Sequence, residues 1–173
     1  MSNYKALLTK VNTFIFDYDG VMTDGKIILL HDGKPLRTAN VKDGYALQLA
    51  RRLGFNVVII SGGISKSVEN RFDSLRIKDV FLGIGNKLET LEKYLKDNNI
   101  NAEQVVYMGD DIPDYRVMKK VGVPVCPADA AEEIKKISVY ISDKKGGEGC
   151  VRDIILQVLK VQGKWLTEEA FHW

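Results

Sequence analysis

The chain has 173 residues, of which 45% are hydrophobic and 28% charged, and its formal net charge is +2. These values are typical of a globular domain with a real core, and a charge this small, with Lys and Arg dispersed along the chain, gives no argument for nucleic-acid binding. No apolar run approaches the roughly 20 residues that span a bilayer, and the N-terminus lacks the apolar core of a secretory signal. Two isolated cysteines are typical of a reducing compartment. We therefore expect one cytoplasmic domain over residues 1–173, with no membrane and no nucleic-acid partner.

Strands and helices alternate along the predicted chain. The first strand, Phe14-Ile15-Phe16, is apolar throughout and should be buried on both faces. A β-hairpin is predicted over about residues 26–39, with its turn at His31-Asp32-Gly33-Lys34. Further strands are predicted at residues 56–60, 79–82, 105–108, 123–126 and 139–141. Helices are predicted at residues 43–53, 66–75, 87–98, 113–121, 131–137 and 151–161, with Asp43 capping the first of them.

This alternation predicts an α/β fold with a doubly wound, Rossmann-like and mostly parallel sheet that has helices on both faces. The hairpin is the only predicted insertion, so no large cap domain is expected. Pro124 cannot donate to a central ladder and places its strand near an edge of the sheet. The last residues, about 162–173, form a tail with two Trp and one Phe.

Polar side chains follow three of the predicted strands at the point where each strand ends. Asp17 and Asp19 follow the first strand, Ser61-Gly62-Gly63 the second, and Asp110 with Asp111 a later one. Asp-Tyr-Asp-Gly taken alone is also a typical turn sequence. Because the carboxyl ends of parallel strands meet at one edge of the sheet, we expect these groups to lie together and to form a ligand site.

Such a cluster has the composition of a phosphoryl-transfer site. Several adjacent carboxylates repel one another unless a cation neutralises them, and carboxylate oxygens without His or Cys suit Mg²⁺. Ser61 with the amides of Gly62 and Gly63 can hold an anion, and Lys87 adds a positive charge for a phosphate. Asp17 can then attack phosphorus, while Asp19 acts as general acid and base.

The motifs occur in the order typical of the haloacid dehalogenase superfamily, which the chain resembles. They are Asp-Tyr-Asp-Gly-Val-Met-Thr-Asp-Gly from Asp17 to Gly25, Ser61 after its strand, Gly85-Asn86-Lys87, and Gly109-Asp110-Asp111 with Asp114. Response-regulator receiver domains use similar groups, but their lysine comes last, which disfavours that alternative.

The resemblance implies a role for each of these residues. Asp17 would be the nucleophile and Asp19 the general acid and base. Mg²⁺ would be held by Asp17, the main-chain oxygen of Asp19, and Asp110. Ser61, Gly62 and Lys87 would bind the phosphoryl group, and Asp111 and Asp114 would support the metal.

Segments outside these motifs resemble a capless subfamily, the 3-deoxy-D-manno-octulosonate 8-phosphate phosphatases. These segments are residues 40–45, 145–149 and 162–164. The resemblance implies hydrolysis of this sugar phosphate in lipopolysaccharide precursor synthesis. It also implies a homotetramer in which a neighbour's hairpin and the C-terminal tail complete each pocket.

One position departs from the subfamily pattern. Octulosonate phosphatases commonly have arginine where this chain has Gly63, and related nonulosonate 9-phosphate phosphatases can have glutamate there. A nonulosonate phosphatase is therefore the alternative enzyme. Gly63 and Arg71 are candidate substrate-binding residues, and the resemblance implies that Arg71 acts from an adjacent subunit. A non-catalytic oligomerisation module is the alternative from another class, and the intact Asp17, Asp19, Lys87 and Asp110 argue against it.

Overall fold

The computed structural model describes residues 4–31, 33 and 35–172. Its centre is a six-stranded parallel sheet with the strand order β5-β4-β1-β6-β7-β8. The strands are β1 (Thr13–Phe16), β4 (Asn56–Ile60), β5 (Asp79–Phe81), β6 (Val105–Met108), β7 (Val123–Cys126) and β8 (Tyr140–Ile141). The helices are α1 (Tyr4–Leu8), α2 (Val41–Arg52), α3 (Lys66–Ser74), α4 (Lys87–Asp97), α5 (Ile112–Met118), α6 (Glu132–Ile137) and α7 (Cys150–Val161). Two 3₁₀ turns, η1 (Ala102–Gln104) and η2 (Glu168–Phe171), complete the elements.

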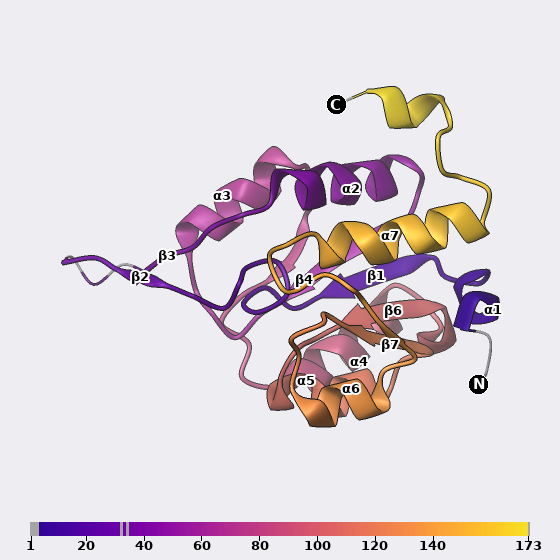
Figure 1. Cartoon of the computed structure of the whole chain (residues 1–173). Coiled ribbons are helices and arrows are strands. Elements are labelled where there is room, and N and C mark those ends of the chain that lie inside the picture. The colour runs from indigo at the N-terminus through magenta and orange to yellow at the C-terminus, as the bar shows by residue number, and fades with distance from the viewer. Residues whose placement is uncertain (1–3, 32, 34, 173) are drawn as a thin grey trace.

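Helices cover both faces of the sheet (Figure 1). One apolar cluster packs α2, α3 and α7 against one face, and a second packs α4, α5 and α6 against the other. The side chains of β1 and β6 are buried throughout because both of their faces are covered. The predicted α/β fold without a large cap is confirmed for the residues that the structure describes.

The register of the central strands brings their carboxyl ends to one level. Phe16 is paired with Ile59 on β4 and with Met108 on β6. The residues that follow these positions are Asp17, Ser61 after one further strand residue, and Gly109-Asp110. The topology therefore delivers the three predicted polar segments to a single edge.

The hairpin projects away from the body of the molecule as an antiparallel pair, β2 (Ile28–Leu29) and β3 (Pro35–Leu36) (Figure 1). Its regular pairing is shorter than the predicted segment over residues 26–39. The predicted turn includes Asp32 and Lys34, which lie outside the described residues.

Three local predictions need correction. Asn40, not Asp43, caps α2, and its side chain accepts the N–H groups of Lys42 and Asp43. The Asp43 carboxylate is occupied elsewhere, because it accepts the backbone N–H of Arg152 at 2.7 Å. Helix α5 ends at Met118, earlier than residue 121. The short helix α1 was not predicted.

The C-terminal tail lies against α2 of its own chain (Figure 1). The Tyr45 hydroxyl donates to the carbonyl oxygen of Ala170, and Arg52 donates to that of His172 at 2.8 Å. Trp165 packs on the apolar cluster of α2 and α7. Among the described residues, no helix has the length and apolar character needed to cross a bilayer.

Candidate active site

Three carboxylates meet at the carboxyl end of β1 and β6. Oxygens of Asp17, Asp110 and Asp114 lie within 4.8 Å of one another. The backbone N–H of Asp17 donates to the carbonyl oxygen of Met108 at 3.0 Å, which extends the pairing of β1 with β6 by one residue. Asp114 lies in the first turn of α5 and accepts the backbone N–H of Asp110 at 3.2 Å. Strand pairing and a helix start thus hold the three acids together.

Lys87 joins two of these acids. It is the first residue of α4, whose N-cap Asn86 accepts the N–H of Glu89. Its Nζ lies 2.7 Å from Asp17 Oδ2 and 2.8 Å from Asp114 Oδ1. Only 6% of the Lys87 side chain is exposed, so these contacts are not competed away by water.

The electrostatics of the cluster show an excess of negative charge. Burial, followed by repulsion from Asp114, raises the pKa of Asp17 to about 7, against the pull of Lys87. The same two causes raise the pKa of Asp110 to about 7. Burial alone would lower the pKa of Lys87, but Asp114 and Asp17 outweigh it and raise that pKa. One ammonium group is thus insufficient for three carboxylates, and their oxygens suit a further hard cation.

Tyr107, on β6, is a site residue that the sequence did not predict. Its buried hydroxyl donates to Asp114 Oδ1 at 2.8 Å. Burial and the nearby Asp114 raise the pKa of Tyr107, which keeps the hydroxyl protonated as a donor. Asp114 Oδ1 thus accepts both Tyr107 and Lys87, while Oδ2 accepts the N–H of Asp110, and the acid fixes the position of Lys87. A tyrosine in an otherwise aliphatic strand directly before Gly109-Asp110 was the available indication.

The hydroxyl of Thr23 organises the loop that follows Asp19. Thr23 Oγ1 accepts the backbone N–H groups of Gly20 and Gly25, each at 3.2 Å. Gly20 has φ +86°, and a Cβ at this position would lie 2.0 Å from Asp110 Oδ2. Only glycine permits this backbone conformation and this close approach of the Asp110 carboxylate to the chain.

A second loop, residues 144–149, supports the first. The N–H of Gly147 donates to the carbonyl oxygen of Val21 at 2.9 Å, and a Cβ on Gly146 would lie 2.0 Å from the carbonyl oxygen of Gly20. Asn40, the cap of α2, donates to the carbonyl oxygen of Gly147 at 3.0 Å. The glycines of this loop therefore let two backbones touch behind the acid cluster.

Ser61 lies where it was predicted, buried at the end of β4. Its Oγ accepts the N–H of Gly63 at 3.2 Å, so one of the two amides expected to hold an anion is directed at this hydroxyl. The carbonyl oxygen of Ser61 accepts the N–H of Ile84, which ties the turn to the loop before α4. Gly62 is exposed and borders the same opening as Lys87.

Asp19 does not belong to the three-acid cluster, and it pairs with a residue that the sequence did not predict. Arg37, which follows β3, donates from Nε to Asp19 Oδ1 at 2.7 Å and from Nη2 to Asp19 Oδ2 at 3.0 Å. This is a two-point guanidinium–carboxylate pair. The Arg37 side chain is 9% exposed and that of Asp19 is 37% exposed. The end of the hairpin thus brings the positive charge of Arg37 to Asp19, and nothing in the sequence around Arg37 predicted this contact.

Two other candidates lie outside the acid cluster. Asp111 caps α5 and accepts the N–H of Ile112 at 2.8 Å on an exposed surface. Arg71, on α3, has its guanidinium against Gly44 of α2, where a Cβ would lie 2.4 Å from Nη2. It also lowers the pKa of Tyr18, which burial raises. Neither side chain belongs to the three-acid cluster, although, after burial, the charge of Asp111 contributes to the raised pKa of Asp110.

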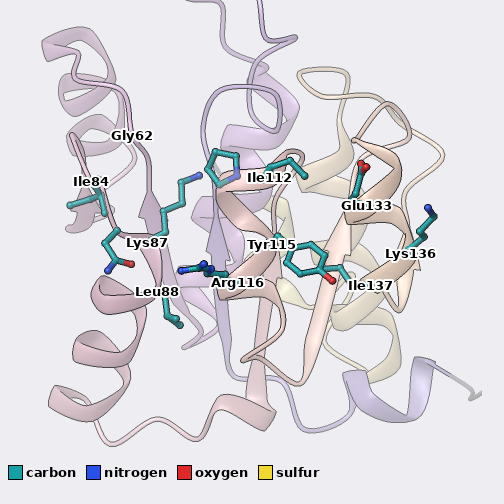
Figure 2. A pocket seen from close by; sticks show the side chains of 13 residues that line it. Gly62, Ile84, Lys87, Leu88, Ile112, Tyr115, Arg116, Glu133, Lys136 and Ile137 are labelled. Carbon is teal, nitrogen blue, oxygen red and sulfur yellow. The ribbon is translucent and has the colours of Figure 1, made fainter.

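A cavity of about 890 Å³ adjoins the cluster at Gly62 and Lys87. Figure 2 shows the side chains of α4 on one side of it, with those of α5 and α6 on the other. Arg116 and Lys136 bring positive charge to its wall. The three carboxylates do not line it, so the cavity meets the cluster only through Lys87.

The arrangement has the parts of a phosphoryl-transfer site. It contains a buried carboxylate beside a lysine, further carboxylates suited to a divalent cation, and a serine with nearby amides at one sheet edge. A parallel α/β sheet with these groups at its carboxyl edge defines a phosphohydrolase.

Comparisons with known proteins identify the family. A model of haloacid dehalogenase-like hydrolases matches residues 79–154. The 3-deoxy-D-manno-octulosonate 8-phosphate phosphatase of Salmonella typhi is 38% identical over 154 residues, which are 89% of this chain and 82% of the relative. The chain therefore belongs to the haloacid dehalogenase-like hydrolases, in the group of 3-deoxy-D-manno-octulosonate 8-phosphate phosphatases.

Solved structures agree with this assignment. The phosphatase of that name from Yersinia pestis superposes with a TM-score of 0.92 at 34% identity, over 94% of this chain and 88% of the other. The enzyme from Moraxella catarrhalis, in complex with magnesium, phosphate and KDO, gives 0.92 at 30% identity, with 95% of each chain covered.

Proposed function

We propose that this protein is a Mg²⁺-dependent phosphatase that hydrolyses 3-deoxy-D-manno-octulosonate 8-phosphate to the free sugar acid and phosphate. The observation that carries the proposal is the bridge from Asp17 through Lys87 to Asp114, with Asp110 beside it. The substrate follows from relatives that share more than a third of their residues with this chain over most of its length.

The residues present fit a bound Mg²⁺. Asp17 and Asp110 would hold the ion, together with the main-chain oxygen of Asp19, and Asp114 would stay in support because Lys87 and Tyr107 already engage it. When bound, the ion neutralises charge on the phosphate and on the acids around it.

Asp17 is the proposed nucleophile. One of its oxygens is paired with Lys87, and the other accepts the N–H of Tyr18 at 2.6 Å, so the carboxylate is held in one orientation. It would attack phosphorus and form an aspartyl-phosphate as the sugar oxygen leaves. Lys87, Ser61 and the Gly62 amide would bind the phosphoryl oxygens and stabilise the charge of the transition state.

Asp19 is the proposed general acid and base. It is more exposed than Asp17 and lies outside the three-acid cluster, and its two-point pair with Arg37 holds the carboxylate in one orientation, from which it would face the leaving group. It would donate a proton to the departing sugar hydroxyl. It would then accept one from the water that hydrolyses the aspartyl-phosphate, which restores both acids.

We further propose that residues 1–173 form one domain, and that four copies of the chain assemble into a cytoplasmic homotetramer. The hairpin supports this proposal because its apolar side chains are exposed: Leu29 by 79% and Ile28 by 60%. An exposed apolar ribbon of this kind is typical of a surface that another chain covers. A neighbour's hairpin would then close the site, and Arg71 would serve the neighbour's pocket. The tail lies on α2 of its own chain, so any part that it takes in a pocket would start from there.

A phosphate-release assay with purified protein and Mg²⁺ tests the proposal. Octulosonate 8-phosphate should be hydrolysed with the highest kcat/KM among sugar phosphates, and chelation should abolish turnover. Preference for a nonulosonate 9-phosphate would replace the substrate and keep the chemistry. Failure to hydrolyse any phosphate ester with Mg²⁺ present would indicate the non-catalytic module instead.

A further inference from the structure

The Arg37–Asp19 pair leaves part of the guanidinium without a partner. Nε and Nη2 donate to Asp19, whereas Nη1 is buried and has no hydrogen-bond acceptor among the residues that the structure describes. A buried donor without an acceptor is unfavourable. Arg37 therefore carries unused binding capacity inside the site, on a side chain that is itself nine-tenths buried.

Gly63 makes room for this guanidinium. A Cβ at residue 63 would lie 3.1 Å from Arg37 Nη2 and 3.1 Å from Asp19 Oδ2. It would also lie 3.7 Å from Ser61 Oγ, the hydroxyl proposed to bind the phosphoryl group. The guanidinium thus stands over the turn of residues 61–63, in space that any larger residue at position 63 would need.

The other cation of the site has no such capacity. Lys87 is placed between Asp17 and Asp114, so its charge is already shared by two carboxylates. Arg37 faces one carboxylate, and that carboxylate is partly exposed. A guanidinium presents five donors in a rigid fork that matches a carboxylate, so it can bind a second acid while it still contacts the first.

We propose that Arg37 is a specificity-determining residue whose guanidinium, for which Gly63 leaves room, binds the carboxylate of a sugar-acid phosphate through its unpaired Nη1. The ligand class is a phosphate ester with a second, carboxylate anion. This inference rests on the proposed function for the phosphate end of the site, and it adds the group that selects the acid end. Arg37 and Gly63 act as one unit, because a side chain at position 63 would displace the guanidinium.

Matched substrates separate binding of the carboxylate from general loss of activity. The pairs are gluconate 6-phosphate with glucose 6-phosphate, and octulosonate 8-phosphate with arabinose 5-phosphate. Wild-type protein should prefer the acid of each pair. Arg37→Met should lower kcat/KM for the acids by about 10- to 150-fold, the range for losing a hydrogen bond to a charged group, mainly through KM. Any loss that comes from releasing Asp19 falls on acids and neutral esters alike, so the readout is the ratio of kcat/KM for the acid to that for the neutral ester of each pair, which should fall by about 10-fold or more.

Gly63→Ala tests the same unit from the other side. Gly63 does not use a left-handed φ, so alanine suits its backbone and acts only through its Cβ. Because this Cβ would lie as close to Asp19 Oδ2 as to Arg37 Nη2, the readout is again the acid-to-neutral ratio of kcat/KM, which should fall in Gly63→Ala and should fall no further in the double variant than in Arg37→Met alone. Lys78→Ala is the matched control, because this exposed lysine precedes β5 at the opposite end of the sheet. It should leave all four constants unchanged.

Three results would overturn the inference. Equal losses for acid and neutral substrates would mean that Arg37 acts only through Asp19. Unchanged selectivity in Arg37→Met, or additive losses in the double variant, would remove Arg37 or its coupling to Gly63. Hydrolysis of gluconate 6-phosphate but not of octulosonate 8-phosphate would refute the proposed substrate alone, and the selectivity of Arg37→Met would still decide the inference.

Discussion

Lys87 Nζ lies 2.8 Å from Asp114 Oδ1, and the Asp114 side chain is 1% exposed. A buried acid that also accepts the Tyr107 hydroxyl cannot move easily, so it holds the lysine against Asp17, the proposed nucleophile. Asp114 thus positions the ammonium group of Lys87, while Asp17 and Asp110 remain available for a metal ion.

Replacing Asp114 should therefore impair catalysis, although Asp114 itself is not proposed to contact the substrate. Asp114→Asn removes the charge that orients Lys87, and we expect kcat/KM to fall by about 100-fold, equivalent to about 2.7 kcal/mol. The protein should remain folded, as judged by circular dichroism and thermal melting. Tyr107→Phe is the control, because it removes only one hydrogen bond to Asp114 and should cost less than about 10-fold. Wild-type turnover in Asp114→Asn would contradict this role.

The two acids of the first motif should respond differently to substitution. Asp17→Asn should abolish turnover and phosphoenzyme formation, because no nucleophile remains at its position. Asp19→Asn should lower turnover of a sugar phosphate by about 10²- to 10⁴-fold, the range for general acid–base catalysis. With p-nitrophenyl phosphate, whose leaving group needs no proton, rapid-quench measurements should show a nearly normal first burst. A burst from Asp17→Asn would refute the nucleophile assignment.

The stability of the metal-free protein should depend on pH. The folded-state pKa values of Asp17 and Asp110 are raised from 3.8 to about 7. Their protonated forms therefore stabilise the fold below about pH 4, and this contribution is lost as the pH rises through about 7. Between about pH 4 and pH 7, each of the two acids should lower the free energy of unfolding by up to about 1.4 kcal/mol per pH unit.

Chemical denaturation at pH 5 and pH 8, with and without Mg²⁺, checks this dependence. Mg²⁺ should raise the free energy of unfolding more at pH 8 than at pH 5, because the ion binds the ionised acids. Burial raises the pKa of Asp43 to about 6, so the ionisation of Asp43 also lowers the stability of the protein as the pH rises, and it does so without metal. The comparison therefore uses the Mg²⁺-dependent difference, and an equal Mg²⁺ effect at both pH values would contradict the prediction.

The loop behind the site should not accept a side chain at Gly146. Gly146→Ala places a Cβ 2.0 Å from the carbonyl oxygen of Gly20, so the two loops must separate. We expect a loss of about 2–4 kcal/mol in stability, at the upper end of single-substitution effects, together with weaker Mg²⁺ binding. Gly85→Ala is the stability control, since a Cβ there meets no atom within 4 Å. Equal melting temperatures for the two variants would refute the clash.

Charges on the hairpin should disrupt the proposed tetramer. Asp at both Ile28 and Leu29 places two anions in an apolar ribbon that makes few contacts with its own chain. Multi-angle light scattering should show a smaller species, and kcat/KM for the sugar phosphate should fall. The control is Lys26→Asp in the same hairpin, because Lys26 is 84% exposed. A fully active tetramer in the double variant would contradict the shared pocket.

The sequence predicted part of the acid cluster, because Asp17 and Asp110 follow buried strands, whereas Asp19 and Asp111, also expected there, lie outside it. In a parallel sheet, the carboxyl ends of neighbouring strands meet whatever the loops do, so Asp17, Ser61 and Asp110 could be assigned to one edge from periodicity alone. The same local rules failed at the start of α2. Asn40 and Asp43 are both good cap residues; Asn40 caps α2, whereas Asp43 accepts the backbone N–H of Arg152, which is 109 residues away.

The identity and order of the chemical groups were thus determined by the sequence: a nucleophile candidate, a second acid, a hydroxyl, a lysine and a further acid pair. Only the tertiary structure decided their partners. It paired Asp19 with Arg37 across the hairpin and left Asp111 on the surface as a cap. The physical reason is that strand and helix periods determine which way a residue faces within its element. A contact between two loops depends on how the whole chain packs, and no local pattern records it.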